Sequence, residues 1–219
     1  MTAGPWRVEA HRGSAAEFHA RDIVPPAVRS LWWLEIDRPA LVLGSTQPAS
    51  VVDEGASAAA GVELVRRRSG GGAVLLVPGQ FLWVDVIVPA GDALWDDDVG
   101  RAAWWLGGSW AAALAACGVA GAEAHRGGMV CTPWSHLICF AGLGPGEVHV
   151  CGRKVVGLSQ RRTRDWARFQ CVAYRRWDPE VLVPLLAEPR PAVEDLAATV
   201  LELDTAIADL RAALEAALP

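Results

Sequence analysis

The sequence predicts an α+β fold in which a mixed, mostly antiparallel sheet is flanked by helices. Residues 81–88 are too uniformly apolar to alternate, which is typical of a strand buried on both faces. Residues 147–151 and 154–159 read as two strands joined by a tight turn, and a third strand follows at 168–174. The chain closes with apolar residues at helical spacing over about 178–219.

The N-terminal part is predicted to alternate short strands with a short helix. Residues 5–11 are expected to form an edge strand, and residues 15–23 a short polar helix. Residues 31–36 and 40–44 are predicted to pair as a β-hairpin across the Asp37-Arg38-Pro39 turn.

The middle of the chain is predicted to continue the same pattern. Residues 50–61 favour a short helix and residues 62–65 a strand. A Trp-rich helix is expected from Val99 to Cys117, with acidic residues 92–98 in its first turn, where the helix dipole favours negative charge. Residues 137–140 have the composition of a short core strand.

The last part of the chain is predicted to be a helical segment docked on a single domain that spans residues 1–219. Spacings of three and four residues between apolar side chains are those of an amphipathic helix. The residues concerned are Leu196, Val200, Leu203, Ile207, Leu210 and Leu214.

Composition excludes several classes of protein. A formal charge of −5 argues against a general nucleic-acid binder. Five cysteines without a C-x-x-C pair, and no signal peptide, favour reduced thiols in the cytoplasm, and no histidine spacing suggests a metal site. Residues 102–122 are uncharged but rich in Ala and Gly, so a buried helix is expected and no membrane span.

A glycine-rich loop is the first candidate for a binding site. Residues 66–74 read Arg-Arg-Arg-Ser-Gly-Gly-Gly-Ala-Val and follow a predicted strand. Consecutive glycines let backbone N–H groups close on a ligand, and the arginines add positive charge, so the loop suits a phosphate or acyl phosphate. The spacing fits neither a dinucleotide fingerprint nor a P-loop, and a plain hairpin connection remains the structural alternative.

The second candidate is Lys154, the only lysine among 20 basic residues. Lysine presents a compact point charge on a thin stem, whereas arginine is a flat fork, so a site that needs one small ammonium cannot accept arginine. Lys154 lies in the segment 152–161, Gly-Arg-Lys-Val-Val-Gly-Leu-Ser-Gln-Arg, and is predicted to sit on a hairpin. A lysine retained by chance on a solvated hairpin is the alternative.

Together the two segments resemble the lipoate–protein ligase and octanoyltransferase family, whose catalytic domain is shared with biotin ligases. That family carries Arg-Arg-x-Ser-Gly-Gly-Gly-Ala-Val and, further along, Gly-Arg-Lys-hydrophobic-x-Gly-x-x-Gln/Tyr-Arg. Residues 66–74 and 152–161 match these motifs, and the resemblance covers about residues 30–175. It implies a class II aminoacyl-tRNA synthetase or biotin synthetase-like fold.

The resemblance implies an enzyme that activates lipoate or octanoate with ATP and Mg²⁺ as an acyl adenylate. The acyl group would pass to a lysine of a lipoyl carrier domain or of a glycine cleavage H-type protein. Lys154 would lie between carboxylate and phosphate, because catalysis here is chiefly charge stabilisation. The expected acyl-adenylate site comprises Gln47, Arg67, Arg68, Ser69, Gly70, Gly71, Gly72, Ala73, Gln80 and Gly157.

One branch of the family implies a different reaction. Octanoyltransferases of that branch carry a catalytic cysteine in a Cys-Phe pair 15 residues before the motif lysine, and Cys139-Phe140 stands at that separation here. A Cys139 thiolate would accept octanoyl from acyl carrier protein, and a nearby ammonium lowers a thiol pKa. Against this, Cys139 lies in a predicted core strand, where cysteines are inert.

The chain departs from the family pattern after the glycine loop. The family has a polar segment with a histidine there, whereas this chain has Leu76 and Val77, and Gln80 is the polar residue that remains. The departure leaves a third interpretation open, in which the protein is a retuned, non-catalytic binder of lipoyl or acyl adenylate.

Overall fold

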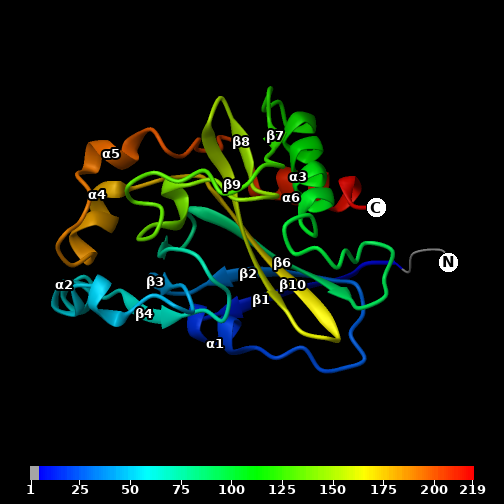
Figure 1. Ribbon diagram of the computed structural model, residues 1–219, viewed down its shortest axis with the longest axis horizontal. Helices are drawn as coiled ribbons and strands as arrows, with labels where there is room; N and C mark the ends of the chain where they lie inside the picture. Colours follow the sequence, from blue (N-terminus) through cyan, green and yellow to red (C-terminus); the bar gives the residue numbers. More distant parts are fainter. Residues whose placement is uncertain (1–4) are drawn as a thin grey trace.

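The structure is a computed structural model that describes residues 5–219, and it contains two sheets (Figure 1). The predicted α+β class with a mostly antiparallel sheet is confirmed, since only β1 with β2 and β3 with β4 pair in parallel. The seven-stranded sheet has the order β1 (Arg7–Gly13), β2 (Ser30–Ile36), β6 (Phe81–Pro89), β10 (Trp166–Tyr174), β9 (Arg153–Arg162), β8 (Val148–Val150) and β7 (Glu123–Ala124). The three-stranded sheet has the order β4 (Glu63–Arg66), β3 (Ala40–Leu43) and β5 (Val74–Leu76).

The helices are short apart from two. α1 begins with a capping box, in which Glu17 N–H donates to Ser14 Oγ and Ser14 N–H to Glu17 Oε2. Two longer helices, α3 (Trp104–Ala116) and α6 (Ile207–Ala217), pack together (Figure 1). The others are α1 (Ala15–Ala20), α2 (Glu54–Ala59), α4 (Pro179–Leu182), α5 (Val193–Ala197) and the 3₁₀ helices η1 (Ala49–Val51), η2 (Cys139–Ala141) and η3 (Val183–Leu185).

Strand β6 shows how the large sheet separates two cores. All residues from Phe81 to Val88 are buried, as predicted for a strand covered on both faces. Successive side chains point to opposite faces, so Trp83 joins the core shared with the small sheet and Val84 joins the core beneath α3 and α6. The space between the two sheets is therefore the interior into which β6, β9 and β10 send their polar side chains.

Two predicted strand features are wrong. β2 and β3 form no hairpin, because the Asp37–Pro39 turn carries the chain from the large sheet to the small one. β2 pairs with β1 and β6, and β3 pairs with β4 and β5. Residues 137–140 are not a strand either. Only Ile138 pairs, in a single bridge with Ala73, before the backbone turns into η2.

The predicted C-terminal helix is interrupted. α5 ends at Ala197, and residues 199–201 then run extended beside Lys154, whose N–H donates to Thr199 O (2.8 Å) and whose C=O accepts from Leu201 N (2.9 Å). These residues pair with the backbone at the start of β9, although the spacing of their apolar side chains is that of a helix. Five of the six apolar residues are still buried and Ile207 is half-buried, which explains why their spacing looked helical.

The acidic residues before α3 also behave differently from the prediction. The first turn of α3 holds no acidic residue, because the helix begins only at Trp104. Asp92 accepts two hydrogen bonds from Arg29 (2.6 and 2.7 Å), and Asp96 pairs with Arg101. Within residues 5–219 no helix combines the length and apolarity that crossing a bilayer requires.

Candidate active site

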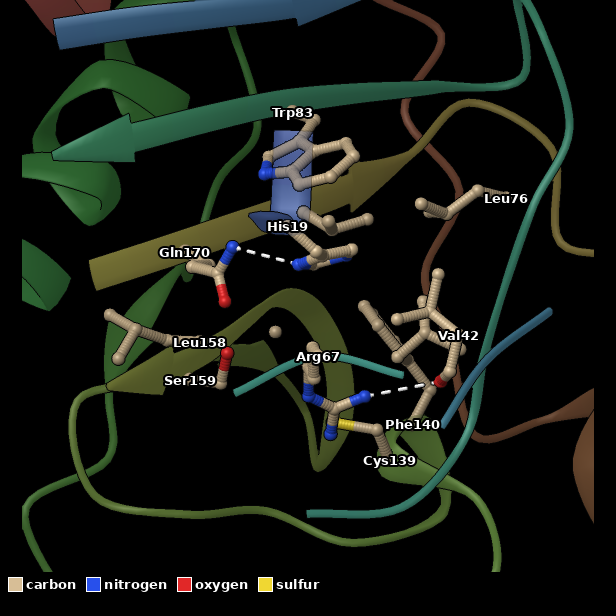
Figure 2. A pocket seen from close by; sticks show the side chains of 13 residues that line it. His19, Val42, Arg67, Leu76, Trp83, Cys139, Phe140, Leu158, Ser159 and Gln170 are labelled. Atoms are coloured by element: carbon tan, nitrogen blue, oxygen red, sulfur yellow. Dashed lines mark hydrogen bonds between the residues drawn. The ribbon is translucent and has the colours of Figure 1, made fainter. Parts of the chain in front are cut away.

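A pocket of about 40 Å³ lies between the two sheets (Figure 2). The large sheet supplies one wall through β6, β9 and β10, with Trp83, Leu158 and Val172 among its apolar side chains. The small sheet supplies the opposite wall through Val42 of β3 and Leu76 of β5. An apolar slot of this kind suits a hydrocarbon chain.

The glycine loop closes one part of this pocket. The backbone at Gly72 lies so near the following segment that a Cβ would come within 2.6 Å of Cys139 N. Gly71 has φ +97°, a conformation that favours glycine, whereas Gly70 faces open space. Ala73 is buried and exchanges backbone hydrogen bonds with Leu137 and Cys139. The loop is thus fixed against η2 on one side and open on the other.

Arg67 holds the loop in shape. Its side chain is 4 % exposed, and its guanidinium donates to Gly70 O (2.7 Å), Gly72 O (2.8 Å) and Val42 O (3.2 Å). Desolvation by burial lowers the pKa of Arg67, while Cys139 and Glu147 act in the opposite direction. Arg68 does not share this site, because it is exposed and pairs with Asp22.

Lys154 is buried, so the alternative of a lysine retained by chance on a solvated hairpin is wrong. It is 2 % exposed, and its Nζ donates to Cys139 O (2.7 Å) and pairs with Glu147 Oε2 (2.7 Å). Glu147 also accepts from the backbone N–H groups of Gly144 (2.5 Å) and Leu158 (3.0 Å). Lys154 and the glycine loop therefore meet at the same residue, Cys139, although Lys154 itself is not among the pocket-lining residues.

Cys139 does not lie in a core strand. It opens the 3₁₀ helix η2, is half-buried, and lines the pocket beside Arg67 (Figure 2). A Cβ placed on Gly71 would be 3.9 Å from the Cys139 Sγ and 2.9 Å from Arg67 Nη2. The sulfur is therefore close to a buried guanidinium, and the main objection to a reactive Cys139 does not hold.

Polar side chains line another part of the pocket. Ser69 Oγ donates to Gln170 Oε1 (3.0 Å) and lies 3.0 Å from Ser159 Oγ. Gln170 Nε2 lies 3.2 Å from His19 Nδ1 (Figure 2). Burial, followed by the charges of Arg168 and Arg67, lowers the pKa of His19 to about 3. His19 is therefore neutral at physiological pH.

Comparison with known families decides the class of the protein. Residues 17–217 match the lipoyl protein ligase A/B catalytic domain. The chain belongs to this family. The match extends the resemblance seen in the two motifs over almost the whole sequence, and it places the pocket in a lipoyl protein ligase-type catalytic domain. A comparison with curated proteins found no match.

Solved structures share the fold of this lipoyl protein ligase family member. A bi-partite lipoate protein ligase from Thermoplasma acidophilum, described with its E2 lipoyl domain, is 17 % identical with a TM-score of 0.76 over 99 % of this chain and 82 % of its own. A lipoate-protein ligase A bound with ATP is 17 % identical with a TM-score of 0.73 (97 % and 83 % covered). LipL1 of P. falciparum, in complex with lipoate, is 12 % identical with a TM-score of 0.66 (97 % and 60 %).

The remaining residues that the motifs predicted are only partly brought together in this lipoyl protein ligase domain. Gln47 is buried, where its Oε1 accepts from Gly44 N (2.9 Å) and its Nε2 donates to Leu137 O (3.0 Å). Gly157 lines the pocket under Phe140, whose ring a Cβ would approach within 2.6 Å. Gln80 does not line it; its carbonyl instead accepts from the N–H groups of Arg175 and Arg176.

Sequence reasoning missed several residues that line or support the pocket. His19, Trp83, Ser159 and Gln170 line it, and Glu147 holds Lys154. Ser159 stands at a variable position of the segment 152–161, and the others come from α1, β6, β10 and the loop before β8, so they share no local pattern. Ser69 was predicted to bind phosphate, whereas here it is buried and hydrogen-bonded to Gln170.

Proposed function

We propose that this protein is a lipoate–protein ligase that activates lipoate or octanoate with ATP and transfers the acyl group to a lysine of a lipoyl carrier domain. The observation that carries the proposal is an apolar pocket that ends at a buried guanidinium and a glycine loop, with a buried ammonium behind them. The names of the structural relatives support it, since they include ligases described with lipoate, with ATP and with a lipoyl domain.

The first chemical step joins two anions. A carboxylate oxygen attacks the α-phosphorus of ATP, a new O–P bond forms, and pyrophosphate leaves. Positive charge and N–H donors held in place before the reaction stabilise the charge that accumulates. Arg67 is suited to this, because its hydrogen bonds go to carbonyl groups and, within residues 5–219, it forms no ion pair with a carboxylate.

Lys154 supplies the second charge. An ammonium has three N–H donors, and two of them are used by Cys139 O and Glu147 Oε2. We propose that the third turns to the ligand carboxylate at the Cys139 end of the pocket. The backbone of Gly70 is open to the phosphate, since nothing lies within 4 Å of a Cβ placed there.

The second step needs no protein nucleophile. The neutral amine of the carrier lysine attacks the acyl carbonyl of the mixed anhydride, an amide bond forms, and AMP leaves with loss of a proton from the amine. Mg²⁺ takes ligands from substrate phosphates and water in nucleotide sites, so we propose that it enters with ATP. Glu147, the carboxylate beside Lys154, is engaged in its ion pair.

Pyrophosphate release from ATP tests the ligase. It should depend on added lipoate or octanoate, and Lys154→Met should abolish it, because the buried ammonium is lost. Arg164→Ala is the matched control, since Arg164 is 93 % exposed and its loss should leave the rate unchanged. Absence of pyrophosphate with every acid tried would rule the ligase out.

Octanoyl transfer through Cys139 is a second candidate, favoured by the position of the Cys139 Sγ in the pocket next to Arg67. The thiolate would attack the thioester carbonyl of octanoyl-acyl carrier protein and release the carrier thiol. An acceptor lysine, on a lipoyl domain or a glycine cleavage H-type protein, would then displace the Cys139 thiolate.

Mass spectrometry separates the two candidates. A transferase incubated with octanoyl-acyl carrier protein should gain one octanoyl group, and Cys139→Ala should lose this adduct while Cys131→Ala, which removes an exposed thiol, keeps it. If Cys139→Ala retains full activity in acyl transfer, the thioester route is wrong.

A further inference from the structure

Four side chains form a hydrogen-bonded chain along the polar part of the pocket. They are Ser159 of β9, Ser69 of the glycine loop, Gln170 of β10 and His19 of α1 (Figure 2). His19, Gln170 and Ser69 are 7 %, 8 % and 2 % exposed. Groups this deeply buried in an apolar slot carry a desolvation cost unless they are hydrogen-bonded, so the direction of each bond matters.

Each of these hydrogen bonds has a fixed donor and a fixed acceptor. Gln170 has one acceptor and one donor group, and its Oε1 accepts from Ser69 Oγ, which leaves its Nε2 for His19. Ser69 has a single hydroxyl hydrogen and uses it on Gln170, so Ser159 is the donor to Ser69. Gln170 Nε2, which can only donate, then donates to His19 Nδ1.

The hydrogen bond from Gln170 sets the tautomer of His19. Because Nδ1 accepts a hydrogen bond, a neutral ring carries its proton on Nε2. The lowered pKa of His19, about 3, keeps the ring neutral. Within residues 5–219 no hydrogen-bond partner is found for Nε2, and the ring lines the pocket. The series of hydrogen bonds therefore ends in one N–H donor on a ring that lines the slot.

His19 and Cys139 lie at different ends of the slot. The His19 ring lies tilted against Trp83 of β6 (centroids 4.8 Å apart), whereas Phe140, next to Cys139, packs on Gly157 of β9. β10 lies between β6 and β9, so the two ends are two strand spacings apart, roughly 10 Å. An acyl chain with its carboxylate at Cys139 would place its far end at His19.

We propose that His19 is a specificity-determining residue that selects acyl chains carrying a hydrogen-bond acceptor, sulfur or oxygen, at the end remote from the carboxylate. This inference rests on the proposed function, because it assumes that the slot holds an acyl chain. Lipoate has such acceptors in its dithiolane sulfurs, and octanoate has none. The protein would then prefer lipoate to octanoate.

Calorimetric titration of the full chain with octanoate, 8-hydroxyoctanoate and lipoate tests the proposal. A purely apolar slot would bind 8-hydroxyoctanoate more weakly than octanoate, because the hydroxyl loses water without a partner. With His19 as donor, the wild-type protein should bind it about fivefold more tightly than octanoate. His19→Phe keeps a ring against Trp83 but removes the N–H, and should reverse this order. The preference for lipoate should shrink about twofold, since sulfur is a weak acceptor.

Two controls keep the outcomes distinct. Circular dichroism and the melting temperature check that His19→Phe is folded before its acid preference is read. His11→Phe removes a histidine that also packs edge-on against a tryptophan, Trp32, outside this slot, and should change nothing. The same acid preference in wild type and His19→Phe would overturn the inference and leave the proposed function intact. If the wild-type protein binds none of the acids, both fail.

Discussion

The two ends of the pocket keep polar groups buried in opposite ways. At the cationic end (Arg67, Cys139, Lys154) full charges are held, one by backbone carbonyls and one by Glu147. At the neutral end (His19, Ser69, Gln170) no charge is held, and a chain of hydrogen bonds keeps the histidine uncharged. The difference teaches that one slot can present both an anion site and a neutral donor, with the glycine loop contributing to both through Arg67 and Ser69.

The two cations of the cationic end also differ from one another. Lys154 is neutralised by a carboxylate in the free protein, whereas Arg67 has carbonyl acceptors only. An incoming anion therefore gains more from Arg67, because it does not have to compete with Glu147 there. This ordering follows from the partners and can be tested by removing each cation in turn.

The largest effect is expected from Lys154→Met. The substitution leaves the Glu147 carboxylate, 4 % exposed in its side chain, without a cation, and breaking a buried pair in this way costs about 3–5 kcal/mol in the free energy of unfolding. Urea denaturation measures the loss. The double variant Lys154→Met/Glu147→Gln should recover most of it; equal midpoints for the single and double variants would show that the pair is not coupled.

A smaller effect is expected from Arg67→Met. The variant keeps much of the side-chain length but leaves the carbonyls of Val42, Gly70 and Gly72 without their charged donor, which should cost about 2–3 kcal/mol. The same denaturation experiment measures it. Arg68→Met is the control one residue further on, and losing its solvent-exposed pair with Asp22 should change the stability little. Similar losses for both variants would contradict the role given to Arg67.

Gly157→Ala tests the close contact between Gly157 of β9 and the Phe140 ring in the pocket wall. A methyl group there would meet the Phe140 ring at 2.6 Å, and overpacking of this kind costs about 1–3 kcal/mol. Gly55→Ala is the control, because its nearest contact is an ordinary 3.4 Å in the helix α2, where alanine stabilises by about 0.5–1 kcal/mol. Melting temperatures of the two variants should therefore move in opposite directions.

The smallest effect concerns the protonation of His19. Its folded pKa of about 3 lies below the model-peptide value of 6.5, so between these values the unfolded chain binds a proton that the folded protein does not. Stability contributed by His19 is thus complete above pH 6.5 and falls as pH decreases towards 3. From pH 7 to 5.5 the loss should be about 1 kcal/mol. His19→Phe should remove this component, and an identical pH dependence in both proteins would show that His19 is not buried neutral.

Much of the site could be predicted because the two motifs are local. Residues 66–74 and 152–161 can each be recognised as short sequences, and Lys154 lies at the predicted hairpin; its burial is a finding of the structure. Strand β6 was also predictable, since a uniform apolar run marks a buried strand, and β9 and β10 were predicted as antiparallel strands joined by a turn. The prediction of a β2–β3 hairpin was wrong, because the composition of a strand does not determine which strand pairs with it. Here a short turn leads from β2 into a strand of the second sheet.

The sequence by itself determined that the chain would build an α+β domain of the lipoyl protein ligase family and which loop and lysine would meet. Only the tertiary structure decided that Cys139 faces the slot, that Glu147 holds Lys154, and that His19 ends a chain of hydrogen bonds. The physical reason is that these relations join α1, the glycine loop, β9 and β10 across the space between two sheets. Such contacts depend on how strands are ordered and which face each residue occupies, and neither is encoded in a local pattern.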